Sequence, residues 1–262
     1  KRAQALRHRS RSDAAASAAI GAATRELRLP VVRSEAARLA EEAGRSHATH
    51  LAYLAEVLTT EIDERTERRR RRLVVEARFP RLKQLIDFDF TAAPRGTEAA
   101  VRTLAQGTYL AKGEPVVFLG DSGTGKSHLL IALGLLATEA GKRVRYATAA
   151  GLVNELVEAQ DERRLGRLVA RLGRLDLLLI DELGYVALDG RGAELLFQVI
   201  TEREERASIA TGSNLPFSEW GQIIADPRLV AAIVDRLTFC GHIIETGTDS
   251  YRLRATRSRK NA

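Results

Sequence analysis

The chain has 262 residues, of which 45% are hydrophobic and 29% are charged, and its formal net charge is +7. This composition excludes a disordered polymer, and no apolar run approaches the roughly 20 residues that a membrane-spanning helix needs, so we expect no membrane partner. The single cysteine, Cys240, excludes an internal disulfide framework and a cysteine-cluster zinc site, which is typical of a cytoplasmic protein.

The positive charge is concentrated in one part of the chain. Residues 1–83 contain 19 Lys and Arg against 11 Asp and Glu, whereas residues 84–262 contain 22 against 23. A further basic tail follows Tyr251. Such an uneven distribution indicates a polyanionic partner such as nucleic acid, but a solvated helical surface rich in Arg explains it equally well.

The first third of the chain is predicted to be helical. Residues 1–29 are rich in Ala and Arg, Pro30 interrupts them, and Ser34 is a candidate N-cap for a helix ending at Gly44. A second helix carries an apolar stripe at helical spacing: Leu51, Leu54, Ala55, Leu58 and Ile62. Its continuation to about Arg78 is nearly all charged and includes five consecutive arginines, so we expect a basic arm.

After Phe79-Pro80 and Asp87-Phe88-Asp89-Phe90, apolar strands alternate with amphipathic helices, which predicts a parallel α/β sheet. The expected strands are 115–120, 143–148, 176–181 and 209–213, with a weaker one at 242–246. The expected helices are 126–140, 152–172, 193–206 and 229–237. Ligands of such sheets bind beyond the carboxyl ends of the strands, where polar motifs do follow.

The first motif is a complete Walker A sequence between a strand and a helix. Its glycines allow backbone N–H groups to surround phosphate oxygens, and the helix N-terminus adds positive dipole character. Lys126 is expected to bridge the β and γ phosphates of ATP and Ser127 to bind Mg²⁺. The residues assigned to the nucleotide are Gly120, Asp121, Ser122, Gly123, Thr124, Gly125, Lys126, Ser127 and His128.

The second motif is a Walker B strand, Leu177 to Ile180, which ends in Asp181 and Glu182. Four consecutive aliphatic residues require a central strand, which brings both acids to the sheet edge beside the phosphate loop. We expect Asp181 to hold Mg²⁺ through water and Glu182 to polarise the attacking water. The second acid favours hydrolysis over transfer to a substrate hydroxyl.

Three further residues are candidates for catalysis. Asn214 follows the next strand, where its amide could position the lytic water or simply cap a turn. Arg228 and Arg236 could each stabilise phosphate charge on a neighbouring subunit, or could form surface pairs with Asp226 and Asp235.

The chain closely resembles the IstB-like ATPases, helper proteins of bacterial transposable elements and relatives of the DnaC helicase loader. The resemblance covers roughly residues 30–254 and is carried by the segments 120–129, 178–185, 213–220, 235–237 and 249–253. The stretch Ser-Asn-Leu-Pro-Phe-Ser-Glu-Trp at 213–220 is the most distinctive.

The resemblance implies an AAA+ P-loop NTPase with a parallel central sheet flanked by helices and without a full C-terminal lid. A small all-helical domain would precede it, which divides the chain into a DNA-binding and oligomerisation region (1–85), an ATPase domain (86–254) and a basic tail (255–262). The resemblance also implies a homo-oligomer on duplex DNA, with ATP between subunits, that recruits and stimulates a transposase.

By the same resemblance, Lys126, Ser127, Asp181, Glu182 and Asn214 take Walker and sensor roles, and Arg236 is preferred to Arg228 as the arginine acting in trans. The arginines expected to contact DNA are Arg65, Arg68, Arg69, Arg70, Arg71, Arg72, Arg163, Arg164 and Arg167.

Three alternatives to a DNA-stimulated transposition ATPase are open. A DnaC-type helicase loader would share the core but prefer single-stranded DNA. A small-molecule kinase would form ADP only with an acceptor present, and a scaffold would bind ATP and DNA without turnover.

Overall fold

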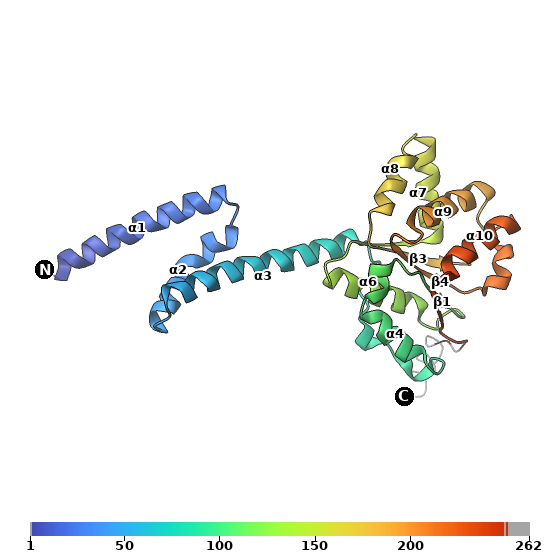
Figure 1. Ribbon diagram of the computed structural model, residues 1–262, viewed down its shortest axis with the longest axis horizontal. Helices are drawn as coiled ribbons and strands as arrows, with labels where there is room; N and C mark the ends of the chain where they lie inside the picture. Colours follow the sequence, from blue (N-terminus) through green and yellow to red (C-terminus); the bar gives the residue numbers. More distant parts are fainter. Residues whose placement is uncertain (1, 249, 251–262) are drawn as a thin grey trace, which may run out of the picture. The chain divides into compact units, whose positions relative to one another are not determined.

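The computed structural model describes residues 2–248 and 250, with side chains from Ala14 onward (Figure 1). The predicted basic tail 255–262 lies outside the described residues. The chain divides into two compact units, residues 1–71 and 72–262, each described here by itself. No helix in the described part is long and apolar enough to cross a membrane.

The first unit is built from helices α1 (Arg2–Glu26), α2 (Pro30–Arg45) and most of α3 (His50–Glu76). Pro30 lies in the first turn of α2. Backbone N–H groups in the first turn have no acceptor within the helix, so the missing N–H of proline costs no helical hydrogen bond there. The prediction of Ser34 as N-cap is therefore wrong: Ser34 lies inside α2, and its hydroxyl donates to the carbonyl of Val31 at 3.1 Å.

The apolar stripe of α3 does not form the core of this unit. Leu51 is 79% exposed and Ile62 is 62% exposed. The face of α3 that contacts α2 instead carries Tyr53, whose hydroxyl donates to the Ala36 carbonyl at 2.9 Å, the buried Val57, and Glu61. These residues follow each other at four-residue spacing, on a different side of α3 from the leucines. One of them is charged, so the apolar pattern alone does not identify the face of α3 that packs against α2.

The second unit contains a five-stranded parallel sheet with the order β2-β3-β4-β1-β5. All five expected strands are confirmed. Their bounds are β1 (Val116–Leu119), β2 (Val144–Thr148), β3 (Leu177–Leu183), β4 (Ser208–Ser213) and β5 (His242–Glu245).

The helices of this unit are α4 (Thr97–Ala105), α5 (Thr108–Lys112), α6 (Lys126–Glu139), α7 (Ala149–Asp161), α8 (Leu165–Gly173), α9 (Gly190–Arg203) and α10 (Pro227–Thr238). Short 3-10 helices occupy Leu85–Asp87, Phe90–Ala92 and Phe217–Gln222. The single helix expected at 152–172 is wrong: it is two helices, because the backbone at Arg163 adopts a left-handed φ of 57° that ends α7.

The helices cover both faces of the sheet (Figure 1). One buried cluster packs α7, α8, α9 and α10 against the sheet, and the other packs α4 and α6 against the opposite face. Residues Leu177 to Ile180 of β3 contribute alternately to the two clusters and are almost fully buried, as a central parallel strand requires. All carboxyl ends of the strands therefore meet at one edge of the sheet.

Candidate nucleotide site

The Walker A segment forms the loop between β1 and α6. Gly120, Gly123 and Gly125 have φ values of 149°, 86° and 99°, a range that favours glycine. Close packing adds a second constraint, because a Cβ at Gly125 would lie 2.4 Å from Phe88 Cε2. The loop is also tied to the end of the sheet: the hydroxyls of Thr124 and Thr246 lie 2.7 Å apart.

Lys126 opens α6 and is buried, with its ammonium folded into the loop. Its Nζ donates to the carbonyl oxygens of Gly120 at 2.6 Å and Asp121 at 2.8 Å. Two backbone carbonyl oxygens thus hold the positive charge of this lysine inside the loop, where it favours binding of an anionic phosphate chain.

Asp181 lies near the end of β3 and is only 2% exposed. Its Oδ2 accepts a hydrogen bond from the hydroxyl of Tyr146 at 2.8 Å, and its Oδ1 accepts one from the backbone N–H of Glu182 at 2.9 Å. Gly212 on the neighbouring β4 leaves room for this carboxylate, because a Cβ there would lie 2.8 Å from Oδ1.

Glu182 sits at an irregularity of the sheet. The pairing of β3 with β4 shifts register between Ile180 and Leu183, and Glu182 has a left-handed φ of 60°. A bulge redirects side chains, and a non-glycine residue in this conformation costs about 1–3 kcal/mol that the surrounding fold must supply. The result is that Asp181 is buried while the adjacent Glu182 is exposed.

The two motifs meet in one cavity of about 400 Å³. The phosphate loop from Ser122 to His128 forms one wall, and Asp181, Glu182 and Tyr185 form another. Sequence reasoning missed the third wall, which comes from the segment before the ATPase core: Arg81, Lys83, Asp87, Phe88, Asp89, Ala92 and Ala93. The alternating acidic and aromatic residues at 87–90 are the available signal, but in the sequence they indicate only where the α/β pattern begins.

His128 turns toward that third wall. Its Nε2 lies 2.8 Å from the Gln84 carbonyl, and its ring packs edge-on against Phe88 with centroids 5.3 Å apart. These contacts make His128 a support for the segment that covers the loop.

Asn214 directly follows β4, the strand between β1 and β3. Its Oδ1 is buried, lies against Gly184, and has no hydrogen-bond partner among the described residues. The side chain is not among those that line the cavity, so its sensor role stays a prediction.

Arg236 lies on α10, away from the nucleotide cavity. It pairs with Glu204, with Nε 3.0 Å from Oε2, and its guanidinium lies 4.7 Å from the centroid of the Phe197 ring. It lines a separate cavity of about 270 Å³ together with Pro115, which precedes β1, and Ile209 at the start of β4. The alternative Arg228 is exposed, and its backbone N–H donates to the carboxylate of Asp226.

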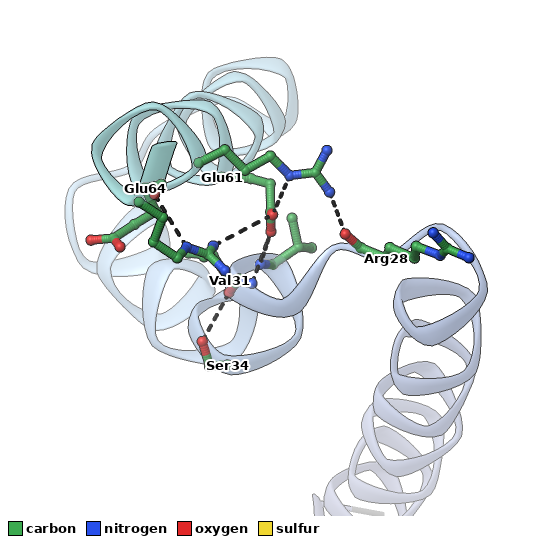
Figure 2. Close-up of polar contacts among 8 residues, drawn as sticks. Arg28, Val31, Ser34, Glu61 and Glu64 are labelled. Carbon is green, nitrogen blue, oxygen red and sulfur yellow. Dashed lines mark hydrogen bonds and ion pairs between the residues drawn. The ribbon is translucent and has the colours of Figure 1, made fainter. Parts of the chain in front are cut away.

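Several arginines in the basic part of α3 form ion pairs with glutamates of the same helix. Glu61 is 2% exposed and accepts hydrogen bonds from Val31 and Val32, at the start of α2, and from Arg65 (Figure 2). Arg65 also donates to the carbonyl of Arg28. This arginine therefore joins the helices of its own unit.

The remaining arginines of this segment differ in their partners. Arg68, Arg71 and Arg72 each pair with a glutamate of α3, whereas Arg69 and Arg70 form no ion pair within the described part of the chain. In the second unit Arg163, Arg164 and Arg167 are exposed, and Arg164 pairs with Glu162.

The donors around the cavity fit Mg²⁺. Ser127 and Asp181 line it together and present only oxygen ligands, and the buried carboxylate keeps acceptor capacity beyond its two hydrogen bonds. The described residues contain no cluster of three or more His, Cys, Asp or Glu suited to a metal.

The parallel sheet, phosphate loop and acidic strand end define a P-loop ATPase of the AAA+ class. In fold the chain is similar to the AMPPCP-bound DnaA from Aquifex aeolicus, with a TM-score of 0.57 and 21% identity over 70% of this chain and 56% of that chain. This likeness shows the fold alone.

The chain belongs to the family described as IstB-like ATP binding protein, which matches residues 22–259. An insertion sequence ATP-binding protein from Sinorhizobium fredii is 37% identical over 93% of this chain and 82% of its own length. The ATP-binding protein of insertion sequence IS5376 from Geobacillus stearothermophilus is 37% identical over 88% of this chain and 92% of its own. The chain is thus an ATP-binding AAA+ ATPase of this family.

Proposed function

We propose that this protein is the ATPase that serves transposition of an insertion sequence by assembling on duplex DNA and recruiting and stimulating a partner transposase. Its relatives are ATP-binding proteins of insertion sequences. The observation that carries the proposal is the single cavity where Lys126 and Ser127 of the phosphate loop face Asp181 and Glu182.

Four residues of that cavity have a role in hydrolysis. Lys126 binds the β and γ phosphates, Ser127 and Asp181 hold Mg²⁺, and Glu182 orients and polarises the attacking water. Mg²⁺, when bound with ATP, neutralises phosphate charge. The exposure of Glu182 beside a buried Asp181 supports this division, because a residue that activates water must reach solvent. Asn214 assists from the adjacent strand end.

The position of Arg236 supports action in trans. Arg236 lines a cavity at the amino ends of β1 and β4, together with Pro115 and Ile209. The nucleotide cavity lies at the opposite edge of the sheet, beyond the carboxyl ends of the strands. An arginine so placed reaches phosphate only on a neighbouring subunit, which requires a homo-oligomer with ATP at its interfaces. Arg228 is the alternative trans arginine.

Duplex DNA is bound through exposed arginines. Arg69 and Arg70 on α3 have no ion pair among the described residues, and Arg163 and Arg167 add exposed positive charge in the second unit. Contacts of this kind go to phosphates and bind DNA mostly without regard to sequence.

The test combines hydrolysis with assembly. Phosphate release is measured with and without duplex DNA, and the ATP-bound complex is sized on duplex and on single-stranded DNA. We expect stimulation and assembly on duplex DNA, and loss of hydrolysis in Lys126→Ala but not in Lys142→Ala, a lysine that lines neither the nucleotide cavity nor the cavity of Arg236. Hydrolysis indifferent to DNA would refute the proposal, and assembly on single strands alone would favour a helicase loader.

A further inference from the structure

The neighbouring strand β2 supplies a side chain to the acidic end of β3 that no motif indicates. In the pairing of these strands Tyr146 stands opposite Leu179, and Thr148 stands opposite Asp181. Opposed residues of paired strands share a face of the sheet, so Tyr146 and Asp181 are diagonal neighbours on one face, within reach of an aromatic side chain. The hydroxyl of Tyr146 lies 2.8 Å from Asp181 Oδ2.

The carboxylate of Asp181 is held from several sides. Its Oδ1 accepts the N–H of Glu182, and Gly212 approaches the same oxygen so closely that a Cβ would lie 2.8 Å away. Its Oδ2 accepts only the hydroxyl of Tyr146 among the described residues. Because Asp181 is almost fully buried, loss of that hydroxyl would leave Oδ2 without a hydrogen-bond donor from the described residues.

We infer that Tyr146 is a positioning residue that fixes the rotation of the Asp181 carboxylate and so presets this side chain for Mg²⁺ bound with ATP. The inference rests on the proposed role of Asp181. Residues that orient a metal ligand through a hydrogen bond typically change metal affinity or activity by about 10- to 100-fold when they are removed. Phenylalanine at this position keeps the ring and removes only the donor.

The experiment compares Tyr146→Phe with Tyr109→Phe, which removes a buried hydroxyl from a residue of the same unit that does not line the nucleotide cavity. The affinity for a fluorescent ATP analogue is measured in EDTA and across a Mg²⁺ titration, together with kcat, KM and thermal unfolding. For Tyr146→Phe we expect unchanged affinity in EDTA, about a tenfold higher Mg²⁺ concentration at half-saturation, and a lower kcat. Tyr109→Phe should match the wild type.

An equal loss of affinity with and without Mg²⁺, or a fall in thermal stability with an unchanged Mg²⁺ requirement, would reduce Tyr146 to a structural role and overturn the inference. Asp181→Asn separates this failure from failure of the proposed function. If Asp181→Asn changes the Mg²⁺ requirement and Tyr146→Phe does not, only the inference falls. If neither changes it, the assignment of Asp181 falls as well.

Discussion

Arg81 and Lys83 bring two positive charges to the nucleotide cavity from a segment that precedes the Walker A loop. Arg81 forms no ion pair within the described part of the chain, and its charge is near enough to act on Tyr146, next to Asp181. Two cations in the cavity proposed to bind ATP would stabilise the negative charge of the triphosphate directly.

We therefore expect Arg81→Ala to raise the KM for ATP several-fold, with a smaller effect at high salt because screening weakens the lost attraction. Steady-state hydrolysis at two ionic strengths measures this. Arg95→Ala, which removes an exposed charge from the same region outside the cavity, is the matched control. An equal KM for both variants would show that Arg81 does not face the phosphates.

At this scale the sequence predicts residues that belong to a contiguous motif. The loop from Gly120 to Ser127 and the pair Asp181-Glu182 are recognisable because the chemistry fixes both residue type and spacing. Tyr146 and Arg81 are not recognisable in this way. Tyr146 contacts Asp181 because of the register between β2 and β3. Arg81 reaches the cavity because the segment that contains it folds against the phosphate loop. Both contacts join residues that are far apart in the sequence.

At the scale of elements, the contact between α2 and α3 includes a buried charged residue, Glu61. Burial acts to raise the pKa of Glu61, but hydrogen bonds from the Val32 N–H, the Arg65 guanidinium and the Val31 N–H outweigh it and hold this pKa below the ordinary value of 4.5. Glu61 therefore caps the start of α2 from α3 (Figure 2).

Removing this charge should loosen α2 from α3. We expect Glu61→Gln in the full chain to lower the protection of the Val31 and Val32 amides against hydrogen exchange several-fold, which corresponds to about 1 kcal/mol. In the wild type the stabilisation is complete above the ordinary pKa of 4.5 and is lost as pH falls through the lowered folded-state pKa. Glu35→Gln, at an exposed pair with Arg38, should leave these amides protected.

The elements show where apolar periodicity succeeds and fails. The strands are predicted well because buried parallel strands are continuous apolar runs, as Leu177 to Ile180 are. The packed face of α3 is not, because it contains Glu61 while the leucines are exposed. The break between α7 and α8 was equally hidden, since Arg163 adopts a left-handed conformation that its residue type does not signal.

At the scale of the whole molecule, the proposed binding of duplex DNA depends on which arginines lack ion pairs more than on the net charge of +7. We expect Arg69→Ala and Arg70→Ala each to reduce the salt dependence of duplex binding by about one phosphate contact. Arg71→Ala should do less, because Arg71 pairs with Glu67 at 2.9 Å. Binding titrations at several salt concentrations test this, and equal slopes for all three variants would contradict the distinction.

The proposed trans role of Arg236 leads to a complementation experiment. A Lys126→Ala subunit lacks a working nucleotide site but keeps its arginine, and an Arg236→Ala subunit has the opposite defect. Each variant alone should be nearly inactive, because an arginine supplied in trans contributes about 10³–10⁵ to hydrolysis in other NTPases. In an equimolar mixture some interfaces combine an intact nucleotide site with an intact arginine, so phosphate release should recover in part. Arg228→Ala mixed with Lys126→Ala is the control. If Arg228→Ala is inactive by itself and activity recovers only in this mixture, and not in the mixture with Arg236→Ala, the trans role belongs to Arg228.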